Sequence, residues 1–323
     1  MKTDDGAQVT VYRPNQRHEL GLLRTWVIMV RNVVESRELI WQLFKRDFFA
    51  QYKKSFVGIA WVFLMPLIVS VNWVILKHAS ILAPGKMEAG GPPYTVYLLV
   101  GTTMWGLFAS TFTGASQTLL AGQTLVMQVN YRHEALLFQQ VAQALARFTI
   151  SLCFIAVMLL AFKIAILHTE PVGELGRPLT DVGRWAQDFP SWRIVLLPVV
   201  LLPLMLFTAG VGLLVSMLAV VVVDVTRLLD RMLALLMMFS PIIYVYTPMD
   251  QIEKGNAWQL MLHYANKFNP LTYLVCSARD ILLYGRVYDN MGFAICSVLA
   301  VVVFLVSWRL FFVSEDRLIE RMI

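Results

Sequence analysis

The strongest constraint on this chain is a series of six long apolar segments. They comprise residues 56–82, 94–115, 141–167, 194–223, 229–248 and 291–313. As a helix, each is long enough to cross about 30 Å of hydrocarbon. The chain is 58% hydrophobic and only 15% charged, whereas soluble domains carry about 25% charged residues. The sequence therefore predicts an all-α polytopic membrane protein with six transmembrane helices, and it excludes a soluble enzyme and a disordered chain.

The basic residues predict the orientation in the membrane. The net charge is +6, and ten of the 27 Lys and Arg residues lie in residues 1–54, before the first apolar segment. Basic residues collect on the cytoplasmic side of membrane proteins, so we expect a cytoplasmic N-terminus. Six crossings then place the C-terminus there too. This explains the basic excess, so nucleic-acid binding is not expected. The polar first twenty residues predict no cleavable signal peptide.

Two domains follow, a cytoplasmic N-terminus over 1–54 and a six-span transmembrane domain over 55–323. Within the first, Leu23, Trp26, Val27 and Val30 recur at helical spacing, and a second apolar piece continues past Ser36. This pattern predicts an amphipathic helix lying in the membrane interface. A helix packed on another cytoplasmic subunit is a compatible alternative.

Residues 249–290 are expected to form a re-entrant loop between the fifth and sixth spans. Two short apolar stretches are separated there by Asn269-Pro270, and the second carries Arg279 and Asp280. Each stretch is too short to span the bilayer, and these charges are costly at its centre. We therefore expect two short re-entrant helices that dip in from the outer face.

Residues 168–192 form an additional outer loop. Thr180 is expected to cap a short helix that starts at Asp181 and ends before Pro190. Trp185, Phe189 and Trp192 then lie on roughly one side. Contact with sugar is one interpretation of these aromatics, but anchoring in the outer membrane interface is favoured because aromatic residues are common at that depth.

Two ordered motifs carry a resemblance to a known family. The junction before the first span reads RDFFAQYKKSFVGIAW over residues 46–61 and continues to Met65-Pro66-Leu67. Downstream lie FSPIIY over residues 239–244, then Asn269-Pro270-Leu271 and Arg279. The order and spacing resemble the membrane subunits of ABC-2 type polysaccharide exporters, and the likeness covers nearly the whole chain.

This resemblance implies a permease that exports a lipid-linked polysaccharide, such as O-antigen, capsule or teichoic acid, across the bacterial cytoplasmic membrane. It implies a homodimer of this chain with two copies of a separate ATPase, in contact with membrane lipids. The sequence contains no G-x-x-x-x-G-K-[ST] motif. We therefore expect no enzyme activity and no bound cofactor in this chain, with ATP and magnesium bound by the partner.

The resemblance and the residue chemistry together nominate four groups of site residues. The expected substrate entrance comprises Arg46, Tyr52, Lys53 and Lys54. Its three basic residues suit a diphosphate and an ordinary anionic lipid about equally, and the resemblance favours the diphosphate of the substrate. The expected channel lining comprises Trp61, Met65, Asn72, Phe239, Tyr244 and Tyr246. The expected outer gate comprises Asn269, Pro270 and Arg279. The expected ATPase contact comprises Tyr131, Arg132 and Glu134.

Each group has a simpler interpretation. Stripes of apolar residues at helical spacing also arise from packing alone, and charged loop residues are usually just solvated. The sequence around Asn130 lacks the proline of the family's Pro-acid pair, and loop 168–192 looks longer than usual. The alternative function is an ABC-2 type drug or small-lipid exporter permease. A glycan-processing enzyme or a secondary transporter is disfavoured because the five histidines are scattered and the spans are almost free of charge.

Overall fold

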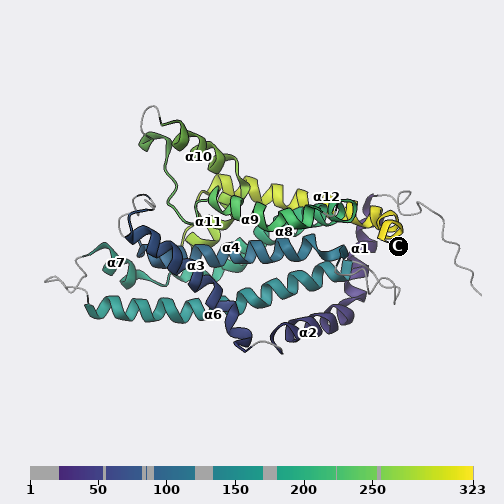
Figure 1. The fold of residues 1–323 in the computed structure, drawn as a ribbon, viewed down its shortest axis with the longest axis horizontal. Coiled ribbons are helices and arrows are strands. Elements are labelled where there is room, and N and C mark those ends of the chain that lie inside the picture. The colour runs from purple at the N-terminus through teal and green to yellow at the C-terminus, as the bar shows by residue number, and fades with distance from the viewer. Residues whose placement is uncertain are drawn as a thin grey trace, which may run out of the picture.

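All regular structure in the described part of the chain is helical, which confirms the predicted all-α class. The computed structural model describes residues 22–53, 56–81, 85, 91–120, 134–169, 180–222, 224–252 and 256–322. The helices, labelled in Figure 1, are α1 (Leu22–Glu35), α2 (Arg37–Lys53), α3 (Trp61–His78), α4 (Tyr94–Ser116), α6 (Glu134–Thr169), α7 (Asp181–Asp188), α8 (Leu197–Val221), α9 (Asp224–Met238), α10 (Ala257–Phe268), α11 (Pro270–Leu283) and α12 (Asn290–Met322). Short 3₁₀ turns over Gly58–Ala60, Trp192–Leu196 and Met249–Gln251 complete the list.

Five helices in the described residues are long and apolar enough to cross a membrane. They cover Gly58–His78, Tyr94–Ser116, Glu134–Thr169, Trp192–Val221 and Asn290–Ser314. α4 lies at the centre, where it contacts α3, α6, α8 and α11, and most of its residues are buried. α3 is its opposite, because Ser70 is the only fully buried residue among its described side chains and the others are exposed or half-buried. The bundle is therefore built around α4, with α3 on its periphery.

Small residues allow the central helices to approach closely. A Cβ added at Gly210 of α8 would lie 2.8 Å from the Cα of Phe304 in α12, and one at Gly212 would overlap the Cβ of Ala115 in α4. Inside a bilayer there is no hydrophobic driving force between helices, so they associate through close van der Waals packing. Glycine is favoured at such crossings because it lets the two backbones approach closely. α8 is therefore held between α4 and α12 through two side-chain-free positions.

The fifth predicted span has different bounds in the structure. α9 begins at Asp224 and ends at Met238, and residues 239–248 follow as irregular backbone. Pro241 has no N–H to donate to a helix and disfavours helical backbone at Ser240. A continuous helix over 229–248 was therefore a wrong expectation, and α9 is not among the five candidate spans of the described residues.

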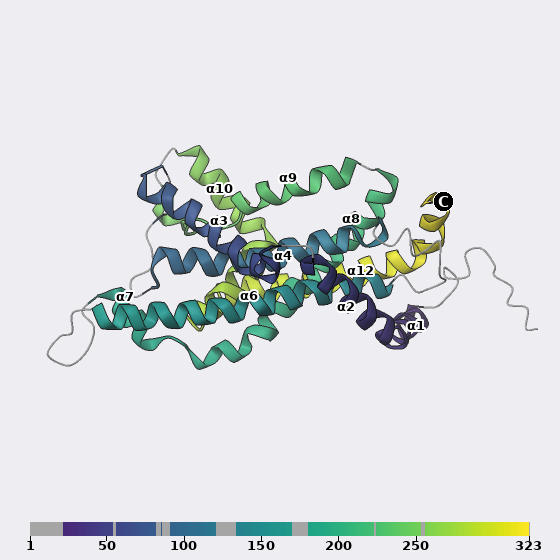
Figure 2. The ribbon, with the colours of Figure 1, turned by 60° about the horizontal axis from the view of Figure 1, so that its bottom comes forward.

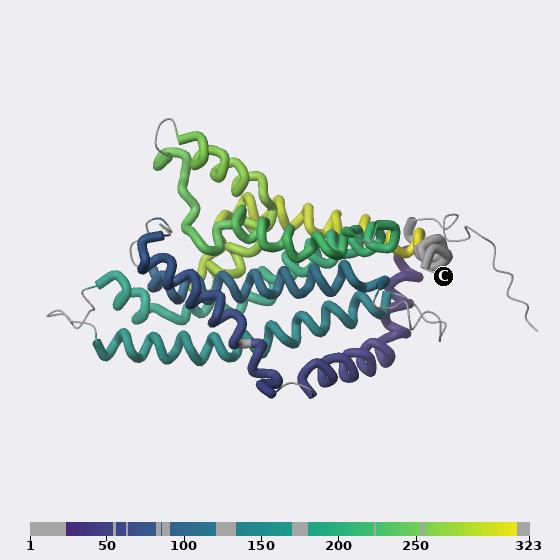
Figure 3. Tube along the Cα trace, in the orientation of Figure 1, coloured from purple at the N-terminus to yellow at the C-terminus, as the bar shows by residue number. Residues whose placement is uncertain are grey.

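The two N-terminal helices and the end of α12 lie at the same end of the bundle. Figures 1 and 3 show α1, α2 and the C-terminus toward one end of the long axis, and α7 and α10 toward the other. α1 contacts α6 and α12, and α2 contacts α6. The predicted amphipathic segment is thus two helices that meet at Ser36 and pack on the bundle of their own chain.

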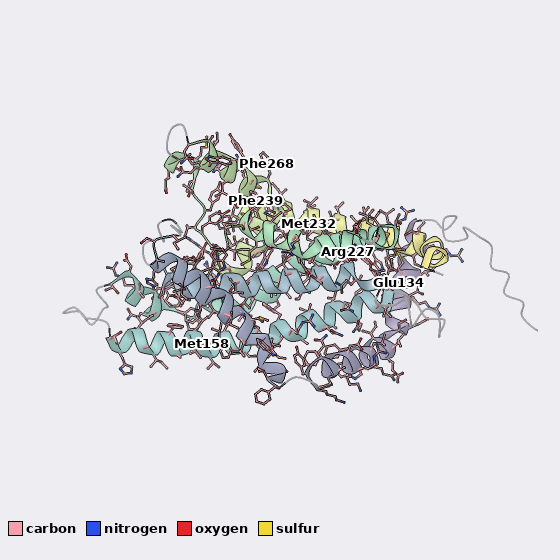
Figure 4. All side chains as sticks on the ribbon, viewed as in Figure 1. Glu134, Met158, Arg227, Met232, Phe239 and Phe268 are labelled. Atoms are coloured by element: carbon pink, nitrogen blue, oxygen red, sulfur yellow. The ribbon has the colours of Figure 1, made fainter. Side chains whose placement is uncertain are left out.

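The helix pair expected in residues 249–290 is present, and its break lies where the sequence predicted it. α10 ends at Phe268, Pro270 is the first residue of α11, and Asn269 Oδ1 accepts a hydrogen bond from the Leu271 amide at 3.0 Å. α11 is almost entirely buried, whereas α10 projects from the bundle with Phe268 exposed (Figure 4). The two helices of the pair therefore have unlike surroundings.

The short helix of the outer loop is confirmed, but its aromatic residues are placed differently than expected. Thr180 Oγ1 accepts a hydrogen bond from the Gly183 amide and caps α7. Trp185 and Phe189 stack on each other and are buried, and Trp185 Nε1 donates to the Leu283 carbonyl at 2.9 Å. Interfacial anchoring by these two was therefore a wrong expectation, since they attach α7 to α11. Only Trp192 is exposed.

The close packing of α8 generates a stability prediction. Gly212→Leu should lower the melting temperature of the detergent-purified protein, because overpacking a tight crossing costs about 1–3 kcal/mol. Gly106→Leu in α4 is the matched control, since a Cβ there meets no atom within 4 Å. Equal melting temperatures for the two variants would contradict the packing described for Gly212.

Candidate functional site

A ladder of polar side chains joins α2 to α6 near the end of the bundle that holds α1. Gln139 Nε2 donates to Asp47 Oδ2 at 3.1 Å, and Gln51 Nε2 donates to Gln143 Oε1 at 3.0 Å. The next rung is Arg147, whose Nη1 lies 3.3 Å from Gln143 Oε1 and 3.4 Å from Gln51 Oε1. The rungs are four residues apart on both helices, which is the spacing of one helix face. The ladder fixes which side of α2 faces the bundle.

The predicted entrance residues lie on or beside this helix. Arg46 is exposed and pairs with Asp47, with 2.6 Å between Nε and Oδ1, and this hydrogen bond raises the pKa of the Arg46 guanidinium. Lys53 is exposed. Burial raises the pKa of the Tyr52 hydroxyl, and the nearby positive charge of Arg147 opposes that shift. Lys54 lies outside the described residues.

A chamber of about 400 Å³ opens between α3, α4 and α6. Its walls are largely apolar and include Trp61 and Met65 of α3 and Trp105 of α4. Gly106 forms part of the wall, and Arg147 is the charged residue among those that line it. Two predicted channel residues, Trp61 and Met65, therefore line a cavity in this protomer.

The outward face of α3 carries one polar side chain among apolar ones. Trp61, Met65, Ile68, Val71 and Ile75 are all exposed on α3. Asn72 is exposed beside them and has no hydrogen-bond partner among the described residues. An amide in hydrocarbon with no partner is unfavourable by several kcal/mol, on the order of 2–7. This face is therefore poorly suited to lipid contact alone.

A buried cluster around Arg279 holds the irregular segment that follows α9. Arg279 Nη1 donates to the Tyr97 hydroxyl at 2.5 Å and to the Pro241 carbonyl at 2.8 Å, and Nε donates to Asp280 Oδ1 at 2.8 Å. Its guanidinium carbon lies 4.0 Å from the centre of the Tyr97 ring. Arg279 and Asp280 are both buried. We call Arg279, Asp280, Tyr97 and the Pro241 carbonyl the arginine clasp.

The predicted gate and late fifth-span residues surround the clasp. Asn269 Nδ2 donates to Ser240 Oγ at 3.0 Å. Tyr244 and Asn266 exchange hydrogen bonds at about 3 Å, and Tyr246 OH lies 3.1 Å from His263 Nδ1. Phe239 is partly exposed at the start of the segment (Figure 4). The structure thus brings the two predicted groups together, with the tyrosines facing α10 and Arg279 enclosed within the fold.

Of the residues expected to contact an ATPase, Glu134 is described, and Tyr131 and Arg132 lie outside the described residues. Glu134 begins α6 and is buried, with Asn32 Nδ2 of α1 at 3.4 Å from its Oε1. Figure 4 shows Glu134 at the end of the bundle near α1. α6 therefore starts at this contact and carries the whole polar ladder on its next three turns.

Known proteins with similar sequences share one description. The chain is 24% identical over 289 residues to an O-antigen export system permease protein, RfbA, of Myxococcus xanthus, covering 90% of this chain and 96% of that protein. Two proteins of the same description from Klebsiella pneumoniae are 22% and 21% identical over 269 residues, covering 83% of this chain and 84% of each. The chain is thus similar to O-antigen export permeases along most of its length. No protein-family model matches it.

The site residues that the sequence did not predict are those whose role depends on a distant partner. Tyr94 donates to the Ile243 carbonyl at 2.7 Å, and Tyr97 belongs to the clasp. Both lie on α4, far in sequence from the segment they hold, and nothing local marks them. Arg147 had a weaker but readable signal, an isolated charge at the edge of a long apolar run.

The described residues of this chain contain no group of His, Cys, Asp and Glu side chains arranged to hold a metal ion. Five ion pairs in these ranges join residues of one helix or neighbours in the chain.

The arginine clasp predicts a large effect of Arg279→Met on stability. Removing the guanidinium leaves Asp280 buried and unpaired, which costs about 3–5 kcal/mol. We expect a marked fall in the melting temperature in detergent, and partial recovery in the double variant Arg279→Met/Asp280→Asn.

Tyr264→Phe is the control for this prediction, because Tyr264 is exposed on α10. A melting temperature of Arg279→Met equal to that of the control would show that the clasp does not stabilise the fold.

Proposed function

We propose that this chain is the membrane-spanning subunit of an ATP-driven exporter of a lipid-linked polysaccharide of the O-antigen type, in the bacterial cytoplasmic membrane. The observation that carries the proposal is the similarity to O-antigen export system permease proteins along 90% of the chain. Five candidate spans in the described residues support a multi-pass membrane protein. The polymer would be the cargo, and this chain would supply its path.

The proposed topology has six crossings. α9 and residues 239–248 together would make the crossing that α9 alone is too short for, since its 15 residues rise about 22 Å at 1.5 Å each. The irregular half is acceptable in a bilayer because its Pro241 and Ile243 carbonyls accept hydrogen bonds from Arg279 and Tyr94 inside the protein. α10 and α11 would be the re-entrant pair, and the basic N-terminus places α1, α2 and the C-terminus on the cytoplasmic side.

The proposed transport path runs along α3 and α9, in a homodimer. Figure 2 shows both helices on the same side of the bundle, and both expose apolar side chains there, including Met65, Met232 and Phe239. A second copy facing this side would enclose a path lined by Trp61, Met65, Asn72, Phe239, Tyr244 and Tyr246. The exposed amide of Asn72 supports a watery path over a lipid contact, because water would satisfy it.

The proposed entrance and outer gate lie at the two ends of this path. Arg46, Tyr52, Lys53 and Lys54 on or beside α2 would form the entrance, where basic groups attract anionic lipid heads. Asn269 and Pro270 would form the outer gate at the junction of α10 and α11. Arg279 would act there as a positioning residue, since it is buried and holds the Pro241 carbonyl.

ATP hydrolysis would take place in a partner. Two copies of a separate ATPase would dock on the end of the bundle that holds α1, with Tyr131 and Arg132 at the contact and the buried Glu134 anchoring the start of α6 behind them. Glu134 supports this location, because it starts α6 and meets α1 through Asn32. Movement of the ATPase would then reach α2 along the polar ladder of α6.

Deletion of the gene in its own bacterium tests the function. We expect surface polysaccharide to be lost and lipid-linked polymer to accumulate inside, as measured by gel electrophoresis and surface labelling, with restoration by the wild-type gene. Normal surface polysaccharide in the deletion strain would reject the proposed function, and loss of a small-molecule efflux phenotype instead would favour the drug or small-lipid exporter.

Replacement of Trp61 tests the path. Trp61→Ala should leave the amount of protein in the membrane unchanged and reduce surface polysaccharide severalfold, because it removes a large aromatic wall from α3. Trp192→Ala is the matched control, since Trp192 is also exposed but lies outside the proposed path. Equal surface polysaccharide in the two variants would remove Trp61 from the lining.

A further inference from the structure

Arg147 carries a charge that its described neighbours do not balance. Its Nη1 contacts two amide oxygens at 3.3 and 3.4 Å, both of them neutral. Among the described residues, no carboxylate forms an ion pair with it. The side chain is partly buried. A guanidinium withdrawn from water without an anion is unfavourable, so this position favours binding of a negative group.

The chamber beside Arg147 also contains a polar group without a hydrogen-bond partner. Ser151, one helical turn further along α6, lines the same chamber, is buried, and has an Oγ with no hydrogen-bond partner in the described structure. The other wall hydroxyls are satisfied by their own helix, as Thr102 and Thr103 donate to the Leu99 carbonyl and Ser110 to the Leu107 carbonyl. Unsatisfied polarity is thus concentrated on the α6 wall.

The position of Arg147 along α6 matches that of a lipid phosphate. Residues 148–162 contain no charged side chain and include only two hydroxyls. Arg147 precedes this stretch directly, and α2, the predicted interface helix, packs beside it through the polar ladder. The guanidinium therefore lies where hydrocarbon gives way to headgroups, and the apolar chamber extends from it toward the hydrocarbon side.

We propose that Arg147 binds the phosphate of the polyprenyl diphosphate carrier of the exported glycan, with a segment of the carrier chain in the chamber. This inference rests on the proposed function. Arginine presents planar N–H groups that suit phosphate oxygens, and Nε and Nη2 of Arg147 have no partner among the described residues. A chamber of about 400 Å³ with largely apolar walls is large enough for a segment of one apolar chain.

Arg147 is a better phosphate site than the predicted entrance residue Arg46. The Arg46 charge is already paired with Asp47 at 2.6 Å, and the side chain is exposed. Exposed pairs and solvated lysines attract anions weakly and without regard to shape. Arg147 has a charge without a counter-ion in the described ranges and lies beside an apolar chamber. We therefore assign recognition of the carrier to α6, and the weaker attraction of lipid headgroups to α2.

The test is direct binding to the full-length protein in detergent. Native mass spectrometry would be used to titrate a long-chain polyprenyl diphosphate against the wild type and four variants, with phosphatidylglycerol as competitor. We expect Arg147→Gln to weaken binding at least about tenfold, because a charge-assisted hydrogen bond is lost. Arg147→Lys should lie between the two, since it keeps the charge without the planar fork.

Two further variants separate the chamber from the charge. Gly106→Leu fills the chamber without meeting any atom at its Cβ, and we expect it to weaken binding about as much as Arg147→Gln. Arg37→Gln removes an exposed arginine of α2 and should leave binding unchanged. If Arg147→Gln aggregates, Gly106→Leu still decides whether the chamber holds the chain.

Wild-type affinity in both Arg147→Gln and Gly106→Leu would overturn the inference. Displacement of the diphosphate by phosphatidylglycerol at equal concentration would also overturn it, because the site would then be a general lipid site. Neither result depends on export, so the surface polysaccharide of the deletion strain remains a separate test of the proposed function.

Discussion

The end of the fold that holds α11 depends on the hydrogen bonds of the buried Arg279 guanidinium. α9 stops at Met238 because Pro241 ends helical backbone, and the carbonyls that follow need donors within the protein. Arg279 of α11 donates a hydrogen bond to the Pro241 carbonyl, and Tyr94 of α4 donates one to the Ile243 carbonyl. One break in a helix thus explains why α11 is buried, why it carries charge, and why tyrosines lie at one end of α4.

At the opposite end, α6 organises the structure in a similar way. Its first four turns carry Glu134, Gln139, Gln143 and Arg147 toward α1 and α2. The contacts are polar and directional, so they determine which face of each N-terminal helix is turned inward. The same row of side chains joins the proposed ATPase contact to the proposed phosphate site, which gives α6 a place in both binding and coupling.

Much of the fold could be predicted from the sequence, because membrane helices are recognised by their length and hydropathy. Asn269-Pro270 is also a strong local signal for the start of a helix. The site was readable only in part. Trp61, Met65 and Asn72 are exposed on α3 as a lining would require, whereas Arg279 is enclosed. Trp185 resembled an interfacial anchor, since the sequence does not reveal that the Leu283 carbonyl lies within reach of its indole N–H.

The sequence alone determined that this chain is helical, that it lies in a bilayer, that one helix pair breaks at Asn269-Pro270, and which protein family it resembles. These properties depend on local composition and on residues close together in the chain. Only the tertiary structure decided that Arg279 is the centre of the arginine clasp. It also decided that Arg147 lies beside an apolar chamber and has no counter-charge among the described residues. The reason is physical: a charge acquires its role from the partners and the dielectric around it, and those partners are contributed by helices far away in sequence.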